Sequence, residues 1–333
     1  MITHQADFCA NVPIAVGLVG TGYAAKLRAA ALQADPRSHL VAVVGHTPSK
    51  TEEFCQTYPA EALDSWPNLI NREDIQLIII SNINCDRNKI IHAALTAGKH
   101  IVVEYPLCLD PGEAENLIAL ATRQKLFLHV EHIELLGGLH QAIKKHLDKI
   151  GKIYYSRYVT ISPQHPAPRK WSYHRELFGF PLSGALSRLH RFTDLFGQVA
   201  TVNCQNQYWD SPESDFYTAC LCNAQLRFTN GVLAEIIYGK GETFWQPEQT
   251  FTIYGEEGKL IFTPDQGQLI KGESIEIIEV GSRRGLFAKD TAMVLDSLIE
   301  GKPLYVTPSE SLYTLKIADA ARRSAETKQI ICL

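Results

Sequence analysis

Short hydrophobic runs alternate with amphipathic segments over the first 130 residues of the chain. The apolar runs lie at residues 14–19, 39–44, 76–80, 100–104 and 126–130. Continuous hydrophobicity over so few residues is typical of parallel strands that are buried on both faces. The intervening pattern predicts helices at 23–34, 86–97 and 111–124, and another that begins near Thr47. Alternating strands and helices with short links indicate a right-handed parallel α/β sheet.

The pattern changes after residue 130. A helix is predicted over 131–150, and longer segments follow in which hydrophobic and polar residues alternate. These strands are expected at 152–162, 201–209, 216–228, 232–238, 249–254 and 259–263. Their alternation favours a mostly antiparallel sheet with one packed face. Helices are predicted at 287–298 and 309–327, and Thr307-Pro308-Ser309-Glu310 has the form of a capping box with proline at the first helical position.

The 333 residues are enough for two hydrophobic cores. We therefore predict an α/β protein with two domains. Residues 1–130 form an N-terminal Rossmann domain with a parallel sheet. Residues 131–333 form a C-terminal α+β domain with a large, mostly antiparallel sheet, and the family resemblance given below implies that this sheet binds the substrate.

Composition excludes several classes of function. The net charge of −4 argues against electrostatic binding to nucleic acid or to an anionic membrane surface. No apolar stretch approaches the roughly 20 residues that a membrane helix requires. The eight cysteines show no spacing typical of a zinc site or a disulfide framework. We expect a cytoplasmic protein with reduced thiols and no metal.

A glycine-rich motif, Gly20-Thr21-Gly22-Tyr23-Ala24-Ala25, follows the first predicted strand and opens a helix. Gly20 permits a tight turn, and Gly22 lets the backbone approach a pyrophosphate at the helix N-terminus. The motif is informative because it lies between a strand and a helix. It predicts a dinucleotide site formed by Gly20, Thr21, Gly22, Tyr23 and Ala24.

The end of the second strand indicates which dinucleotide is bound. An enzyme specific for NAD carries an acidic residue here, but this chain has no carboxylate before Glu52. Thr47 and Ser49 offer hydroxyls and Lys50 offers a cation, which suit the 2′-phosphate of NADP. We therefore predict that NADPH is preferred over NADH.

Polar residues at the ends of the later strands complete the predicted site. Ser81 and Asn82 end the third strand and are expected to contact the cofactor. Glu104 ends the fourth strand and is expected to position the backbone or the cofactor. His132 follows the fifth strand, on the side where open α/β sheets bind ligands, and is a candidate for the substrate site.

The segment from Gly98-Lys99-His100 to Glu104-Tyr105-Pro106 resembles the Gly-Lys-His…Glu-Lys-Pro segment of the glucose–fructose oxidoreductase (Gfo/Idh/MocA-like) family. Proteins of this family join a Rossmann domain to an α/β domain whose open sheet carries the substrate, and the resemblance covers nearly the whole chain. Its sugar enzymes use a lysine, an aspartate and a histidine to move a hydroxyl proton. Here Tyr105, Arg188 and Phe192 occupy those positions. An ordinary tyrosine titrates near pH 10, so oxidation of an alcohol is not expected.

These departures are similar to the biliverdin reductase branch of the family. The segments that carry this resemblance are 104–106, 131–136, 178–181, 187–189 and 195–197. The resemblance implies NADPH-dependent reduction of biliverdin to bilirubin, with hydride transfer to the C10 methine bridge.

Such a pigment is planar and carries two propionates, and arginine can bind a carboxylate or stack on a π face. We predict that Arg188 orients the bilin and polarises or protonates it, directly or through water. Tyr105 is predicted to line the nicotinamide pocket. The remaining candidates for bilin binding are Arg191, His132, Lys170 and Arg175.

Two alternatives remain open at the level of sequence. The first is an NADP-dependent reductase of the same superfamily that acts on another conjugated or sugar-like carbonyl. The second is a regulator that binds NADP without catalysis, because the lysine of the sugar enzymes is missing at Tyr105.

Overall fold

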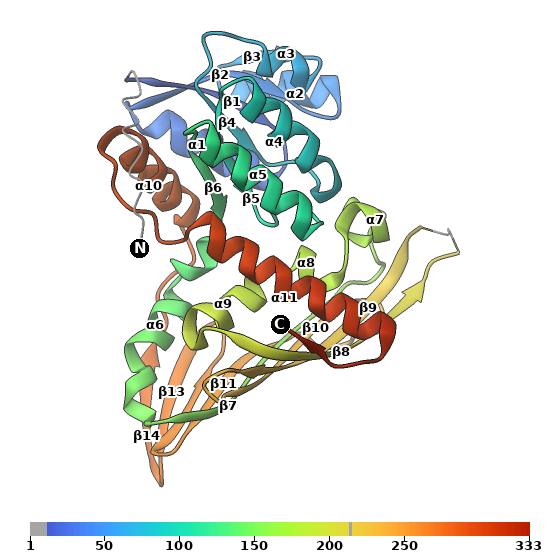
Figure 1. Cartoon of the computed structure of the whole chain (residues 1–333), viewed down its shortest axis with the longest axis vertical. Helices are drawn as coiled ribbons and strands as arrows, with labels where there is room; N and C mark the ends of the chain where they lie inside the picture. Colours follow the sequence, from blue (N-terminus) through green and yellow to red (C-terminus); the bar gives the residue numbers. More distant parts are fainter. Residues whose placement is uncertain (1–11, 213–214) are drawn as a thin grey trace. The chain divides into compact units, whose positions relative to one another are not determined.

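The computed structural model describes residues 12–212 and 215–333, and the chain divides into two compact units. The first unit contains the described residues up to Ile133 together with Gly285–Leu312. The second contains Glu134–Arg284 and Tyr313–Leu333. In the described ranges, each unit is built on one sheet (Figure 1).

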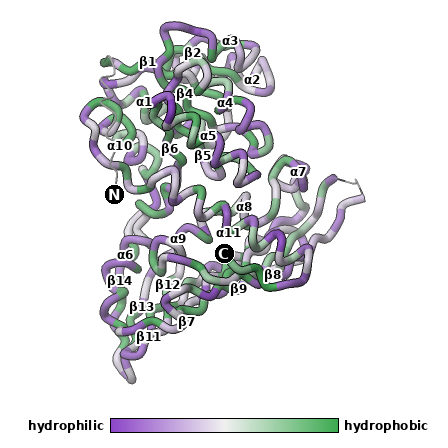
Figure 2. The backbone as a smooth tube through the Cα atoms, viewed as in Figure 1, coloured by the Kyte–Doolittle hydropathy of each residue, from purple (hydrophilic) through white to green (hydrophobic). Residues whose placement is uncertain are grey.

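The first unit has a parallel sheet with the strand order β3-β2-β1-β4-β5-β6. Its strands are β1 (Ile14–Val19), β2 (Ser38–Val44), β3 (Glu61–Leu63), β4 (Leu77–Ile80), β5 (His100–Glu104) and β6 (Leu128–Glu131). This order is that of dinucleotide-binding Rossmann folds, so the predicted architecture is confirmed. Every residue of β1 and β4 is buried, which explains their continuous hydrophobicity (Figure 2).

Helices connect these strands. They are α1 (Tyr23–Ala34), α2 (Pro48–Thr57), α3 (Trp66–Ile70), α4 (Arg87–Thr96) and α5 (Pro111–Arg123), with a 3₁₀ turn η1 (Asn84–Asp86) before α4 and another, η2 (Ile133–Leu135), after β6. Helix α5 shows how the sequence sets a helix start. Asp110 is its N-cap and accepts a hydrogen bond of 2.8 Å from the backbone N–H of Glu113, with proline at the first helical position.

Helix α10 (Leu286–Glu300) belongs to the first unit, although the sequence prediction placed it in the domain that begins at residue 131. Val294, Leu295 and Leu298 are fully buried in the same hydrophobic core as β1 and α1. A buried ion pair also joins Asp290 of α10 to Arg28 of α1. Helix α10 therefore packs in the first unit, where its apolar face is covered, although it comes late in the chain.

The second unit has a sheet with the order β14-β13-β12-β11-β7-β10-β9-β8-β15. The strands are β7 (Ile153–Pro163), β8 (Val199–Asp210), β9 (Tyr217–Phe228), β10 (Leu233–Gly241), β11 (Glu248–Gly255), β12 (Gly258–Phe262), β13 (Gln266–Lys271), β14 (Ser274–Glu279) and β15 (Ile331–Cys332). Neighbours are antiparallel except β7 and β10, which are parallel. The prediction of a mostly antiparallel sheet is confirmed, although it omitted β13, β14 and β15.

Helices cover one face of this sheet. They are α6 (Gly138–His146) with the 3₁₀ turn η3 (Leu147–Ile150), the turn η4 (Trp171–Tyr173), α7 (Arg175–Phe178), α8 (Pro181–Gly184), α9 (Ser187–Phe196) and most of α11 (Pro308–Thr327). Helix α11 lies over β8, because Tyr313 accepts a hydrogen bond of 2.7 Å from the N–H of Val199 and Ser324 accepts one of 2.9 Å from that of Cys204. The predicted capping box is confirmed, with reciprocal hydrogen bonds between Thr307 and Glu310.

The predicted helix over 131–150 was wrong at its start. Glu131 ends β6, and the regular helix α6 begins only at Gly138. A Cβ atom at Gly138 would lie 2.1 Å from the carbonyl oxygen of Gly281, so the close approach of these two backbones requires glycine.

Within residues 12–212 and 215–333, no helix combines the length and the apolar character that crossing a bilayer requires. The seven cysteines of these ranges are free thiols. No cluster of three or more histidine, cysteine, aspartate or glutamate side chains there could bind a metal ion.

Candidate active site

The glycine turn follows β1 in a conformation that favours glycine. Gly20 has φ +118°, and a Cβ there would lie 2.5 Å from the carbonyl oxygen of Ser81. Gly22 is the N-cap of α1, and no side chain caps this helix. A Cβ at Gly22 would meet nothing within 4 Å. The first turn of α1 therefore leaves backbone N–H groups available to an anion, and this fits a dinucleotide pyrophosphate.

The other predicted cofactor residues of this region lie at the carboxyl ends of β1 and β2. Thr21 and Ala24 are half-buried, whereas Tyr23 is 76% exposed. Thr47 is the N-cap of α2, and its hydroxyl makes no capping hydrogen bond. Ser49 and Lys50 are exposed in the first turn of α2. Their contacts with a cofactor remain predictions.

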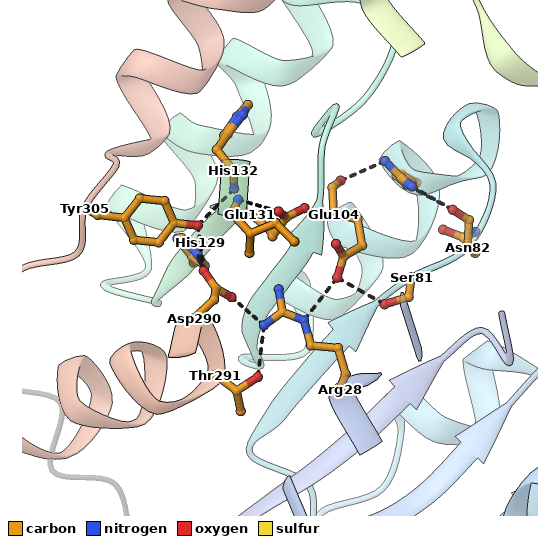
Figure 3. Close-up of polar contacts among 12 residues, drawn as sticks. Arg28, Ser81, Asn82, Glu104, His129, Glu131, His132, Asp290, Thr291 and Tyr305 are labelled. Atoms are coloured by element: carbon orange, nitrogen blue, oxygen red, sulfur yellow. Dashed lines mark hydrogen bonds and ion pairs between the residues drawn. The ribbon is translucent and has the colours of Figure 1, made fainter. Parts of the chain in front are cut away.

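Glu104 lies at the end of β5 within a buried polar network (Figure 3). Its carboxylate accepts hydrogen bonds from Arg28 Nε at 3.1 Å and from the Ser81 hydroxyl at 3.4 Å. Arg28 is fully buried and also donates to Asp290 and, at 3.0 Å, to Thr291. Burial alone would lower the pKa of Arg28, but Asp290 and Glu104 outweigh it and raise this pKa.

Two carboxyl groups face each other at the ends of adjacent strands. Glu104 and Glu131 are partners in the parallel register of β5 and β6. Burial, and then the nearby Glu104, raise the pKa of Glu131 well above its usual value. Asp290 behaves oppositely, because Arg28 and His129 overcome the effect of burial and lower its pKa. Within this network the Glu131 carboxyl therefore binds a proton more readily than an ordinary glutamate, and the Asp290 carboxyl binds one less readily than an ordinary aspartate.

Arg87, which sequence reasoning did not assign to the site, fixes the turn that carries Tyr105. The guanidinium donates to the carbonyl oxygens of Glu104 at 2.7 Å, Pro106 at 2.8 Å and Asn82 at 2.8 Å. Burial lowers the pKa of Arg87 to about 10, so it stays charged at neutral pH. A single cation thus ties the end of β5 to the loop that follows β4.

Tyr105 stacks on His132. Their ring centroids are 5.3 Å apart and their planes differ by 12°. His132 is buried, and its Nε2 lies 2.9 Å from the Ser311 hydroxyl. Its backbone N–H donates to the Tyr305 hydroxyl at 3.0 Å, which in turn donates to Asp290 at 2.7 Å. His132 therefore supports the Tyr105 ring in the first unit, and its predicted contact with a substrate stays a prediction.

The residues Arg28, His129, Asp290 and Tyr305 were missed by sequence reasoning. One signal was available for Arg28, because it lies on the face of α1 that also carries Ala25, Ala29 and Leu32, all buried. A charge on an apolar helix face needs a buried partner. Nothing local to the sequence identifies that partner as Asp290, which is 262 residues away.

The second unit contains a cavity of about 430 Å³ that Arg188 and Arg191 of α9 both line. The three-residue spacing puts the two arginines on one side of the helix. Arg188 donates to the Ser187 hydroxyl at 3.2 Å, and its guanidinium carbon lies 5.3 Å from the centroid of the Tyr238 ring. Other residues that line the cavity are Glu134, Tyr158, Gln249, Asp265 and Arg283.

Arg191 is buried and pairs with Glu134 at 2.7 Å. Arg283 pairs with the same carboxylate through its Nε, also at 2.7 Å. Burial would raise the pKa of Glu134, but the two arginines outweigh it and lower this pKa. Arg191 is therefore held by an ion pair at the cavity wall, and a role in substrate binding remains a prediction.

The other two basic candidates lie outside this cavity. Lys170 is exposed, and its carbonyl accepts a hydrogen bond of 2.8 Å from the N–H of Tyr173. Arg175 pairs with Asp210, and its guanidinium carbon lies 4.1 Å from the centroid of the Tyr208 ring. The structure thus brings Arg188 and Arg191 together at one cavity, whereas Arg175 contacts Asp210 and Tyr208 of β8.

Comparison with known proteins agrees with this geometry. Residues 14–132 match the "Oxidoreductase family, NAD-binding Rossmann fold" of the Gfo/Idh/MocA proteins, and residues 144–333 match the family's "C-terminal alpha/beta domain". A biliverdin reductase from Synechocystis sp. PCC 6803, solved in complex with biliverdin and NADP+, is 50% identical with a TM-score of 0.93. The match covers 94% of this chain and 99% of that chain.

Two curated relatives are more distant. Biliverdin reductase A of Mus musculus is 24% identical over 317 residues, which cover 94% of this chain and 97% of the mouse protein. The dTDP-3,4-didehydro-2,6-dideoxy-alpha-D-glucose 3-reductase of Actinomadura kijaniata is 25% identical over 333 residues, which cover 94% of this chain and 96% of that enzyme. Both parts of the family pattern are present in order, and the chain belongs to the Gfo/Idh/MocA oxidoreductase family.

Proposed function

We propose that this protein is an NADPH-dependent biliverdin reductase that forms bilirubin by hydride transfer to the C10 methine carbon. The observation that carries the proposal is the 50% identity, over 94% of this chain, to an enzyme whose structure contains biliverdin and NADP+. The residue at position 105 agrees with it, because a tyrosine replaces the lysine by which sugar enzymes of the family move a hydroxyl proton.

The first unit binds the cofactor in this proposal. The turn at Gly20 and Gly22 and the N-terminus of α1 receive the pyrophosphate. Thr47, Ser49 and Lys50 receive the 2′-phosphate, and Ser81, Asn82 and Glu104 line the nicotinamide end. When bound, NADPH supplies the hydride.

Arg188 supplies positive charge to the pigment. Addition of a hydride places a negative charge on the conjugated system, and a fixed cation stabilises that charge. A proton must then reach a pyrrole nitrogen. Because arginine stays protonated in proteins, water delivers this proton while Arg188 orients and polarises the bilin. One hydride and one proton together convert biliverdin to bilirubin.

Tyr105 has a smaller role. Its stacking on His132 and the arginine-anchored turn before Pro106 fix a flat surface at the end of β5. Such a surface orients a planar ring without transferring a proton. We therefore assign Tyr105 to cofactor and substrate packing.

The test is spectroscopic. Protein, NADPH and biliverdin are mixed, and conversion of the green pigment to the yellow product is followed for wild type, Arg188→Ala and Tyr105→Phe. We expect a far greater loss of kcat/KM for Arg188→Ala than for Tyr105→Phe. Arg322→Ala, on the exposed side of α11, is the control for loss of an arginine. Equal losses at Arg188 and Tyr105 would refute the assigned roles.

The likeness to the 3-ketoreductase of dTDP-sugars favours one alternative, a reductase of sugar-like carbonyls. Turnover of such a ketone without turnover of biliverdin would establish it. Tight binding of NADPH with no reduction of either substrate would instead indicate a regulator.

A further inference from the structure

A lysine of β10 is buried among aromatic rings in the second unit. Lys240 is 6% exposed, and its Nζ lies 3.7 Å from the centroid of the Phe178 ring and 4.7 Å from that of Tyr173. The rings of Tyr217 and Tyr238 follow at 5.4 and 6.0 Å. We call these four rings the aromatic cage. They face the ammonium with their π systems, which attract cations.

The cage holds a charge without a countercharge. Within the described residues no carboxylate pairs with Lys240, and its ammonium donates only to the carbonyl oxygen of Ser172. Burial, with a further contribution from Arg188, lowers the pKa of Lys240 to about 8. A buried ammonium with no acid costs stability relative to an apolar side chain of similar size. This cost indicates a functional residue.

Tyr238 connects Lys240 with Arg188. It lies two residues before Lys240 on β10, so both side chains point to the same face of the sheet. The Arg188 guanidinium carbon lies 5.3 Å from the centroid of the Tyr238 ring. The same ring is therefore contacted by two cations, one from α9 and one from its own strand.

Lys240 also anchors the segment 171–178. The Ser172 carbonyl accepts hydrogen bonds from Lys240 and, at 2.9 Å, from the Tyr217 hydroxyl. This segment supplies Tyr173 and Phe178 to the aromatic cage. Loss of the ammonium would leave the Ser172 carbonyl with the Tyr217 hydroxyl as its donor and would remove the group around which the four rings are arranged.

We propose that Lys240 is a positioning residue, which sets the place of the Arg188 guanidinium through the Tyr238 ring. The inference rests on the role of Arg188 under the proposed function. In this proposal Lys240 acts on the reaction only through the arginine.

The first experiment needs no turnover. The rate at which phenylglyoxal modifies Arg188 is measured by peptide mass spectrometry in wild type, Lys240→Met and Lys240→Arg. We expect Lys240→Met to change this rate and Lys240→Arg to restore it. Lys259→Met is the matched control, because Lys259 also lies over a ring, that of Tyr254 at 4.6 Å, on a different strand. An unchanged rate in Lys240→Met would overturn the proposal.

The second experiment is a double-mutant cycle on biliverdin reduction. Lys240→Met alone should lower kcat/KM by about tenfold or more, as misplacement of a catalytic group does. In an Arg188→Ala background the same change should have little further effect. An equal loss in both backgrounds would show that Lys240 acts independently of Arg188, contrary to the proposal.

A further variant keeps the test valid if Lys240→Met fails to fold. Tyr238→Leu removes the aromatic ring between the two cations and leaves the Lys240 ammonium. It should alter the rate of Arg188 modification as Lys240→Met does. If wild type does not reduce biliverdin, the proposed function fails, whereas the modification rates still decide whether Lys240 positions Arg188.

Discussion

Asp290→Asn tests the buried ion network of the first unit. Asp290 is fully buried, pairs with Arg28 and lies 2.8 Å from His129 Nε2. The substitution keeps the shape of the side chain and removes its charge. It leaves Arg28, also fully buried, with Glu104 as its remaining ion-pair partner.

The expected cost follows from burial. Removing one partner of a buried ion pair destabilises a protein by about 3–5 kcal/mol when the other charge is left uncompensated. Because Glu104 still pairs with Arg28 in Asp290→Asn, we expect a cost at the lower end of this range. Asp296 is the matched control on the same helix. It pairs with Arg37 at 2.5 Å, but the side chains are 31% and 30% exposed. Exposed pairs contribute about 0–1 kcal/mol, so Asp296→Asn should cost no more than that.

The assay is urea unfolding of wild type, Asp290→Asn and Asp296→Asn. The pKa of Asp290 is lowered in the folded protein, so its stabilisation is present above the unfolded pKa and is lost as pH falls. The difference between wild type and Asp290→Asn should therefore be full at pH 7 and shrink below about pH 4. Equal free energies of unfolding for the two variants would refute the assignment of Asp290 as a buried carboxylate that compensates the charge of Arg28.

Three further predictions concern single side chains. Because the folded pKa of Lys240 is about 8 and its ordinary value is 10.5, the unfolded chain binds more protons between these values. The free energy of unfolding of the wild type should therefore rise with pH over this range. Lys240→Met should abolish the rise and stabilise the fold at pH 7 by up to about 3 kcal/mol. A variant less stable than the wild type at pH 7 would contradict this. Lys50→Ala should raise KM for NADPH by about tenfold and leave KM for NADH unchanged, because only NADPH loses a charge-assisted phosphate contact. Lys26→Ala, at another exposed lysine, is the control. Equal effects on both cofactors would exclude a contact between Lys50 and the 2′-phosphate. Tyr105→Phe keeps the stacking on His132 and should leave kcat/KM within about threefold, so a larger loss would show that its hydroxyl takes part in the reaction.

Much of the fold could be predicted from local pattern. The strands at 14–19 and 100–104 are buried on both faces, so their hydrophobicity is continuous, and α1 has the predicted bounds of 23–34. The glycine turn could also be predicted, because the positive φ of Gly20 is a conformation that favours glycine. Each of these features depends on residues that are neighbours in sequence.

What the sequence did not reveal depends on distant contacts. Strand β14 is exposed at five of its six positions, and Ile275 and Ile277 are among them, so its burial does not follow its hydrophobic residues. The place of α10 depends on Arg28 and on the core of the first unit, and neither is visible from residues 286–300. The aromatic cage likewise gathers residues from η4, α7, β9 and β10 around Lys240, which the sequence analysis did not single out.

The route of the hydride is the most direct test of the proposed reaction. Biliverdin is reduced by the protein with NADPH that carries deuterium at both C4 positions of the dihydronicotinamide, and the product is examined by mass spectrometry and NMR. We predict one deuterium per bilirubin, bound at C10. Unlabelled bilirubin, or a label on any other carbon, would contradict hydride transfer to the central methine bridge.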